Sequence, residues 1–204
     1  MKIVLASNNA GKLAELQTLF APLGMTLVRQ SELNIPEAAE PFKTFVENAL
    51  AKARHAAQLS GIPALADDAG LCVDAFGGQP GVDTAYYATR FGYPKGDDTN
   101  VTALLEQMQG MANRRAAMVS TLVALRSADD PEPLIAVGRV VVQITPERRG
   151  SNGFGFDPVM FLPEFGKTFA ELPPEVKNAN SHRGRAAQAM LALMRERWLD
   201  SAAP

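Results

Sequence analysis

The sequence predicts an α/β protein, because strand-like and helix-like patterns alternate along the chain. Short apolar runs that are typical of buried strands occur near the start of the chain and through its middle. Longer segments repeat apolar residues every three to four positions, which is the period of an amphipathic helix. A tight polar turn joins the first strand to the first helix.

Strands are expected at 2–6, 26–29, 116–125 and 134–144, and the apolar residues on both sides of an acidic pair within 65–73 are also typical of buried strands. Helices are expected where the apolar stripes run, at 13–23, 42–57, 98–108 and 187–198. A connection rich in Asp and Pro separates the fourth and fifth strands, so an antiparallel hairpin is their simplest arrangement. In the helix at 42–57, Phe42 and Val46 belong to the apolar stripe, whereas Asn48 and Lys52 are expected on the solvated face.

The composition is that of a soluble globular protein with one domain over residues 1–204, or one domain with a small lobe. The formal net charge is −2, so the overall field does not attract nucleic acid or an anionic membrane. The single cysteine, Cys72, suits a reducing cytoplasm and is expected to be a buried hydrophobic side chain. No apolar run approaches the ~20 residues that span a bilayer, and the chain becomes polar too early for a signal peptide. We therefore expect a cytoplasmic protein that binds no membrane and no nucleic acid.

The turn Ser7–Lys12 is predicted to bind phosphate. Backbone N–H groups at a helix start attract anions, and a first-turn lysine opposes the helix dipole unless an anion meets it. The turn is not a Walker A loop, because Ala6 and Leu13 stand where that motif has glycine and Ser or Thr. A capped helix with a solvated lysine is the alternative.

An acidic pair, Asp67 and Asp68, interrupts the apolar run 65–73. Side chains alternate across a strand, so the two carboxylates point to opposite faces unless the backbone turns at Gly70. A buried carboxylate is normally matched by a cation, a metal or hydrogen-bond donors. For this motif taken alone, a structural turn between two strands is the simplest interpretation.

Two later segments add groups that suit a nucleotide. Phe154 lies between glycines, which is typical either of an aromatic that stacks on a nucleobase or of a hydrophobic loop anchor. Asp157 beside it offers an acceptor for N–H and O–H groups. His182 and Arg183 fall at the start of the last helix and form a second cationic corner, with a basic surface turn as the alternative.

These features together match a nucleoside triphosphate held with Mg²⁺, since that ion is usually bound by one or two carboxylates plus substrate phosphates. The only histidines are His55 and His182, so neither a His/Cys metal cage nor a Ser-His-Asp triad is indicated.

Six motifs, in this order, resemble the inosine/xanthosine triphosphate pyrophosphatases, which remove non-standard purine nucleotides. The motifs are Ser7-Asn8-Asn9-Ala10-Gly11-Lys12, Phe45-Val46-Glu47-Asn48-Ala49, Ala66-Asp67-Asp68-Ala69-Gly70-Leu71, Gly77-Gly78-Gln79-Pro80-Gly81, Gly153-Phe154-Gly155-Phe156-Asp157-Pro158 and Ser181-His182-Arg183-Gly184. The resemblance covers nearly the full chain with compatible spacing.

The resemblance implies hydrolysis of ITP, dITP and XTP to the monophosphate and pyrophosphate, with dependence on Mg²⁺. It also implies a homodimer and an elongated α/β fold, in which a central mixed sheet is flanked by helices and an active-site cleft lies between two lobes. A pyrophosphatase for other modified nucleotides and a non-catalytic nucleotide sensor are the alternatives.

By the same resemblance, Asp68 and Lys12 are catalytic residues, with Asp68 as general base. Asp68 and Glu40 are implied as metal ligands, with Glu37 and Glu47 as other candidates in place of Glu40. The implied nucleotide contacts are Ser7, Asn8, Asn9, Ala10, Gly11, Lys12, Lys52, Ala69, Phe154, Gly155, Phe156, Asp157, Lys177, His182 and Arg183. The family often has serine where this chain has Ala69, so only a backbone contact can be kept at that position.

Overall fold

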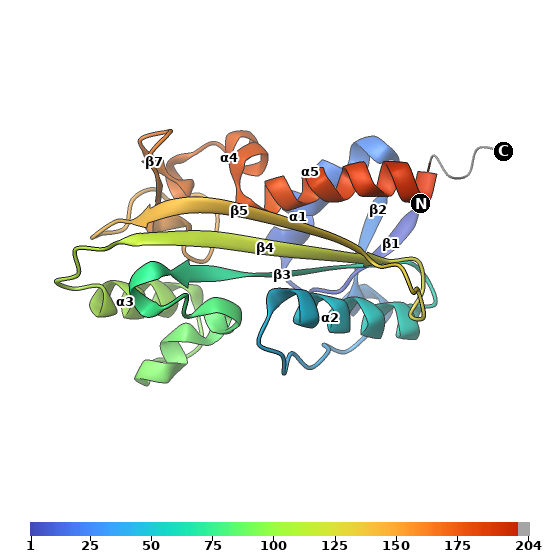
Figure 1. Ribbon diagram of the computed structural model, residues 1–204, viewed down its shortest axis with the longest axis horizontal. Helices are drawn as coiled ribbons and strands as arrows, with labels where there is room; N and C mark the ends of the chain where they lie inside the picture. Colours follow the sequence, from blue (N-terminus) through green and yellow to red (C-terminus); the bar gives the residue numbers. More distant parts are fainter. Residues whose placement is uncertain (200–204) are drawn as a thin grey trace. The chain divides into compact units, whose positions relative to one another are not determined.

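The computed structural model of the protein describes residues 1–199 and has an α/β architecture (Figure 1). Its strands are β1 Lys2–Leu5, β2 Thr26–Arg29, β3 Ala64–Val73, β4 Arg115–Leu125, β5 Leu134–Ile144, β6 Met160–Leu162 and β7 Lys167–Thr168. Its α-helices are α1 Ala10–Phe20, α2 Phe45–Ser60, α3 Asp97–Gln107, α4 Pro174–Asn180 and α5 His182–Met194. Short 3₁₀ segments lie at Ala21–Leu23, Gln30–Leu33, Asp74–Phe76, Gly81–Phe91, Asp157–Val159 and Phe169–Glu171, and a π-helical turn at Arg195–Leu199.

The strands form one mixed sheet, which confirms the prediction of a mixed sheet flanked by helices. Their order is β2-β1-β3-β4-β5-β6-β7. Strand β1 pairs in parallel with both β2 and β3, whereas β6 pairs antiparallel with both β5 and β7. Strands β4 and β5 are neighbours, as a hairpin requires.

By their internal contacts the residues fall into two compact units. The first unit comprises residues 1–68 and 120–138 and the chain from 182 onward, and the second comprises 69–119 and 139–181. That residues 1–204 form a single domain therefore remains a prediction.

The first unit buries both faces of its strands. Because side chains alternate along a strand, Ile3 and Leu5 of β1 lie on one face, against α1 and α5, while Val4 and Ala6 lie on the other, against α2. Figure 1 shows α5 and α2 on opposite sides of these strands. The two faces place the starts of α1 and α5 on one side of β3, and α2 on the other.

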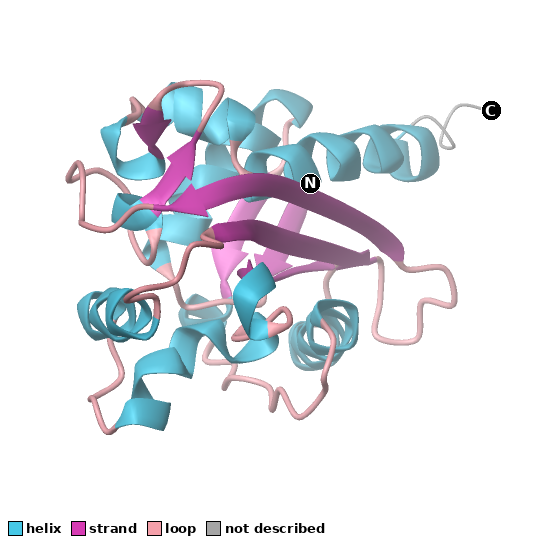
Figure 2. Cartoon of the chain, turned by 60° about the vertical axis from the view of Figure 1, so that its left-hand side comes forward, coloured by secondary structure: helices cyan, strands magenta, loops and turns pink. Residues whose placement is uncertain are grey.

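The second unit has a hydrophobic core of its own, in which helices also lie against strands (Figure 2). Helix α3 supplies Val101 and Leu104, and the loop before β6 supplies Phe156. The alternating side chains Val140 and Val142 of β5 pack into the same core. Within residues 1–199, no helix has both the length and the apolar character that a bilayer span requires.

Two local predictions were wrong. Strand β3 runs unbroken from Ala64 to Val73, so Gly70 makes no turn and the acidic pair does not sit between two strands. Helix α2 begins at Phe45, with the Thr44 hydroxyl accepting a hydrogen bond from the Glu47 N–H. Asn48 is buried because its amide bonds both backbone groups of Phe42, and Phe42 itself is exposed.

Candidate active site

Asp67 and Asp68 are buried neighbours on β3 that face opposite sides of the sheet. Leu65, two residues before Asp67, packs in the core below α1 and α5, whereas Ala66, two residues before Asp68, packs below α2. An unbroken strand therefore assigns one carboxylate to each helix layer. Both lie in the first unit.

Asp67 meets two cations and a hydroxyl. Its Oδ2 lies 3.1 Å from Lys12 Nζ and 2.9 Å from Arg183 Nε, and its Oδ1 accepts a hydrogen bond of 2.7 Å from Ser120 Oγ. Burial alone raises the pKa of Asp67, but Lys12, Arg183 and the Ser120 hydroxyl outweigh burial and hold the pKa well below its usual range. Asp67 is therefore a permanent anion at neutral pH.

Arg183 is the second residue of α5 and is almost fully buried. Its Nη1 lies 2.6 Å from Glu15 Oε2 on α1, in addition to the Asp67 contact. Burial lowers the pKa of Arg183, and Asp67 and Glu15 more than reverse this effect, so the guanidinium keeps its charge. The two carboxylates fix the orientation of this side chain.

Asp68 has a different set of partners. Lys52 Nζ on α2 lies 2.8 Å from Asp68 Oδ1 and 2.8 Å from Glu40 Oε2. Asp68 Oδ2 is buried and accepts no hydrogen bond from residues 1–199. Burial raises the pKa of Asp68, and the nearby Lys52 only partly opposes this effect. Asp68 is thus a more basic carboxylate than its neighbour.

The lysines from the two helix layers meet at the backbone of β3. The carbonyl oxygen of Asp67 lies 3.3 Å from Lys12 Nζ and 3.2 Å from Lys52 Nζ. One backbone oxygen therefore brings together the Lys12 ammonium, which is predicted to hold phosphate, and the Lys52 ammonium, which is predicted to contact the nucleotide.

The turn before α1 is shaped by its own polar side chains. Asn9 is the N-cap, and its Oδ1 accepts a hydrogen bond of 3.0 Å from the Lys12 N–H. The Ser7 hydroxyl accepts the Asn9 N–H at 3.2 Å, and the Asn8 amide donates to Glu37 at 3.0 Å. A helix start of this kind directs backbone N–H groups outward, as the phosphate prediction requires.

The donor set of the first unit fits one divalent cation. Its linked ion pairs contain four carboxylates, from Glu15, Glu40, Asp67 and Asp68, against the three cations Lys12, Lys52 and Arg183. A triphosphate that enters such a site needs additional positive charge. The unpartnered Asp68 Oδ2 is a buried oxygen that a cation would satisfy.

The protein does not supply a complete metal cage. No cluster of three or more His, Cys, Asp or Glu side chains in residues 1–199 is placed to hold a metal ion. The acidic pair Asp68 and Glu40 therefore matches an ion that also takes ligands from substrate phosphates and water.

The second unit contains the predicted base-binding loop. Asp157 Oδ2 lies 2.6 Å from Lys177 Nζ and accepts a 2.9 Å hydrogen bond from the Phe154 N–H. The Lys177 ammonium also lies 4.7 Å from the centre of the Phe154 ring. The Gly155 N–H donates to Asp97 Oδ2 of α3 at 3.0 Å, which ties the loop to that helix.

The structure groups the predicted residues unit by unit. Lys12, Lys52, Asp68 and Arg183 gather around β3 in the first unit, and Glu40 joins them through Lys52. Phe154, Asp157 and Lys177 gather in the second unit.

Two predicted contacts are limited by burial. Phe156 lies in the core of the second unit, so its ring faces other apolar side chains and only its backbone can reach a nucleotide. His182 is buried at the start of α5. Ala69 follows Asp68 on β3 and is only partly buried.

Sequence reasoning missed three members of the first-unit network, namely Asp67 as a partner of cations, Glu15 and Ser120. Glu15 stands one helical turn after Lys12, so spacing could have indicated it. Ser120 belongs to the apolar run of β4, and no local pattern distinguishes it.

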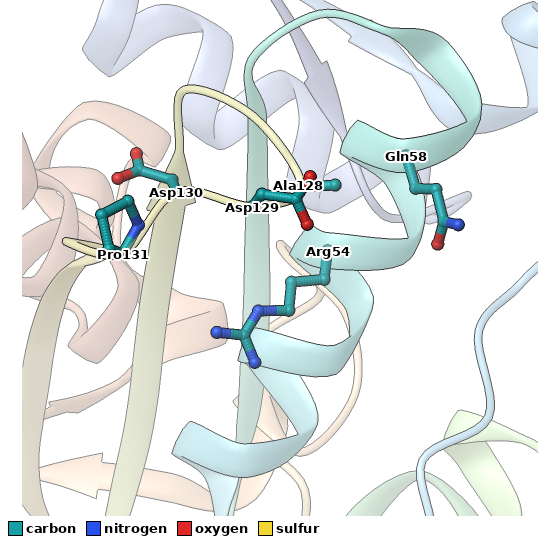
Figure 3. Close-up of a pocket in the computed structure, with 6 residues that line it drawn as sticks. All are labelled: Arg54, Gln58, Ala128, Asp129, Asp130 and Pro131. Carbon is teal, nitrogen blue, oxygen red and sulfur yellow. The ribbon is translucent and has the colours of Figure 1, made fainter.

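A separate pocket of about 480 Å³ lies beside α2 and the β4–β5 connection (Figure 3). Its lining residues are Arg54, Gln58, Ala128, Asp129, Asp130 and Pro131. None of them is a predicted nucleotide contact. The carboxylate of Asp130 accepts the N–H groups of Arg126 and Glu132, so it shapes the turn.

Comparison with known proteins extends over nearly the whole chain. Residues 3–193 match the Ham1 family. The chain is 79% identical over 198 residues to the dITP/XTP pyrophosphatase of Paracidovorax citrulli (strain AAC00-1), covering 97% of this chain and 100% of the relative. It is 77% identical over 199 residues to the dITP/XTP pyrophosphatase of Albidiferax ferrireducens, covering 98% and 100%.

Solved structures agree with this similarity. A HAM1 protein from Coxiella burnetii superposes with a TM-score of 0.87 at 41% identity, covering 96% of this chain and 99% of that one. The Ham1 protein of Staphylococcus aureus gives 0.84 at 34% identity, again covering 96% and 99%. The chain therefore belongs to the Ham1 family.

Proposed function

We propose that this protein hydrolyses the non-standard purine nucleoside triphosphates ITP, dITP and XTP to the monophosphate and pyrophosphate, and so cleanses the nucleotide pool. Relatives at 79% and 77% identity carry the name dITP/XTP pyrophosphatase. The observation that carries the proposal is the meeting of Lys12, Lys52 and Arg183 around the Asp67-Asp68 step of β3. Such a cluster suits a polyanion that arrives with a metal ion.

The phosphates are bound at the start of α1. The N–H groups of Ala10 and Gly11 in the first helical turn, together with the Lys12 ammonium, give donors and positive charge for the polyphosphate. Ser7, Asn8 and Asn9 form the turn that presents them. Lys52 adds a second ammonium from the other side of β3.

Asp68 and Glu40 would hold Mg²⁺, since both bind Lys52 and Asp68 has a buried oxygen without a partner. When bound, this ion would offset phosphate charge and acidify water. Glu37, which faces Asn8, is the alternative to Glu40 in the same acidic loop.

Asp68 orients a water molecule toward the α-phosphorus and takes its proton. The water oxygen bonds to the α-phosphorus, and the bond between the α-phosphorus and the oxygen that it shares with the β-phosphate breaks. Pyrophosphate then leaves beside Lys12. The raised pKa that burial gives Asp68 makes it a better base than an ordinary aspartate. Positioning and electrostatics supply most of the rate, as is general in phosphoryl transfer.

Groups that suit a nucleobase occur in the Phe154 loop of the second unit and, separately, at the start of α5 in the first unit. Phe154 offers a ring for stacking, and Asp157 offers a carboxylate beside it. ITP and XTP carry a carbonyl at purine position 6 where ATP carries an amine, so donors such as His182 and Arg183 favour the former. Sites built on buried hydrogen bonds can discriminate by about 10⁴-fold.

The protein acts as a cytoplasmic homodimer in this proposal. Ile135 and Val137 on β5 are 44% and 58% exposed, which leaves apolar surface for a second copy to cover. Light scattering on the purified protein is expected to give twice the mass of the chain, and a monomer at all concentrations would contradict the dimer.

One assay tests the activity. Pyrophosphate release is measured with ITP, dITP, XTP, GTP and ATP, with Mg²⁺ and with EDTA. We expect fast release from the first three, slow release from ATP, and none in EDTA. Release from a methylated pyrimidine triphosphate alone would favour a related pyrophosphatase, and tight binding of dITP without release would favour a nucleotide sensor.

A further inference from the structure

Asp67 contacts every cation of the first-unit site. Its carboxylate bonds Lys12 and Arg183, and its backbone carbonyl lies within hydrogen-bonding distance of Lys12 and Lys52. These three cations come from α1, α2 and α5, which are far apart in the sequence. One residue of β3 thus links three helices at the place where phosphate is proposed to bind.

The Asp67 side chain is itself rigidly held. It has no exposed surface, and the fully buried Ser120 on the neighbouring strand β4 donates to its second oxygen. A lysine side chain has many rotamers, so a fixed carboxylate at 3.1 Å restricts where the Lys12 ammonium can lie. Arg183 is restricted in the same way from two sides, by Asp67 and Glu15.

The two adjacent carboxylates therefore differ in what they can do. Asp67 has both oxygens engaged by cations or a hydroxyl, whereas Asp68 keeps one oxygen without a partner. A carboxylate whose charge is already neutralised by two cations is a poorer base and a poorer metal ligand than one that keeps a free oxygen. It can, however, preorganise the charges that the reaction uses.

We infer that Asp67 is a positioning residue, which holds Lys12 and Arg183 in their working places and so leaves Asp68 available for water and metal. This inference rests on the proposed function. The first aspartate of the pair thereby gains a role, and the chemistry of the hydrolysis alone does not require this role.

The test compares Asp67→Asn with Ser120→Ala in the full chain. Asp67→Asn keeps the shape but removes the charge that holds Lys12, and we expect kcat for dITP to fall roughly 10-fold or more, because small misplacements of reacting groups are costly. The KM should stay within about threefold, since the cations themselves remain. Ser120→Ala, which only loosens Asp67, should lower kcat by about threefold.

A second measurement reports on Lys12 directly. Acetylation of lysines by a limiting amount of acetic anhydride, followed by mass spectrometry, compares Lys12 with the exposed Lys43. We expect the labelling of Lys12 relative to Lys43 to rise several-fold in Asp67→Asn. Unchanged labelling, or a kcat within twofold of wild type in folded Asp67→Asn, would overturn the inference.

Asp130→Asn is the matched control, because Asp130 is another buried aspartate of the first unit and serves a turn. It should lower thermal stability without changing kcat or Lys12 labelling. If Asp67→Asn does not fold, Ser120→Ala decides, and an unchanged kcat there contradicts the inference. An inactive wild-type protein would contradict the proposed function, whereas an active wild type with an equally active variant contradicts only the role of Asp67.

Discussion

The two units each contain buried contacts between lysine and aspartate, but the contacts are built differently. In the second unit, one oxygen of Asp157 meets the Lys177 ammonium at 2.6 Å and the Phe154 N–H at 2.9 Å, and the aromatic ring lies over the same ammonium. Charge is neutralised locally and the pair supports an aromatic surface. This arrangement suits the uncharged part of a ligand.

The first unit instead links several charged side chains and leaves one carboxylate oxygen without a partner. Lys52 is shared by Asp68 and Glu40, Asp67 is shared by Lys12 and Arg183, and Asp68 retains an unpartnered buried oxygen. Networks of this kind can exchange partners when a new anion and cation arrive. The first-unit network therefore suits a polyphosphate that arrives with a metal ion, whereas the Phe154 loop suits an uncharged aromatic group.

The largest expected effect is on turnover in the first unit. Asp68→Asn removes the proposed base and one metal ligand while keeping the size of the side chain, so kcat should fall by roughly 10²-fold or more. Steady-state pyrophosphate release from dITP measures it, with circular dichroism to verify folding. A folded variant with nearly normal turnover would remove Asp68 from the mechanism and weaken the contrast between the units.

The next effect falls on binding in the second unit. An added Cβ at Gly153 would lie 2.1 Å from Asp157 Oδ2 and 3.1 Å from Lys177 Nζ, at a φ of +80°. Gly153→Ala should therefore displace the ion pair and raise the KM for dITP by about 10-fold, as expected for the loss of a charge-assisted hydrogen bond, with a smaller change in kcat.

Gly166→Ala is the control for that variant. Gly166 has a φ of +62° and no atom within 4 Å of an added Cβ, so it carries the backbone strain without the clash. Equal KM values for the two variants would show that strain, and not displacement of Asp157 and Lys177, explains any loss.

A third substitution tests how the first unit places Arg183. Gly138 on β5 lets the start of α5 approach closely, because an added Cβ would lie 1.9 Å from the His182 carbonyl oxygen and 2.4 Å from the Ala186 nitrogen. Gly138→Ala should lower the free energy of unfolding by about 1–3 kcal/mol, as overpacking does, and should lower kcat severalfold.

Gln143→Ala, at an exposed polar position of β5, is the control and should change stability by less than about 0.5 kcal/mol. Urea unfolding measures both variants. A Gly138→Ala protein as stable as Gln143→Ala would mean that α5 can shift without cost.

Much of the fold could be predicted because periodicity reports burial. Val101, Leu104 and Met108, three residues of the apolar stripe predicted at 98–108, are buried in the structure. Asn48 was misplaced because its buried amide is satisfied by the backbone of Phe42, a contact that no pattern of apolar residues encodes. Gly70 was misread because glycine also occurs within unbroken strands.

The candidate site was predictable where chemistry is local. Lys12, at a capped helix start, is an example. The partners of Asp67 could not be predicted, because Ser120 and Arg183 come from distant parts of the chain. Only the folded protein brings them to one carboxylate. The division of tasks between Asp67 and Asp68 therefore depends on tertiary structure.

The smallest expected effect is on acid stability, and it concerns Asp67. Its pKa is lower in the folded protein than in the unfolded chain, so its ionisation stabilises the fold above the unfolded pKa, for which the ordinary value is 3.8, and this contribution is lost as the pH falls further. The gap in unfolding free energy between wild type and Asp67→Asn should thus be constant above about pH 5 and shrink below pH 4, by at most about 1.4 kcal/mol per pH unit. Urea unfolding in EDTA from pH 3 to 7 measures this gap.

Glu32→Gln is the control, because it removes an exposed carboxyl whose pKa is lowered by a hydrogen bond from Arg29. The difference in unfolding free energy between wild type and Glu32→Gln should change less with pH. A gap for Asp67→Asn that does not narrow in acid would mean that the charge of Asp67 is not stabilised by Lys12 and Arg183, and the contrast between the two units would then lose its electrostatic basis.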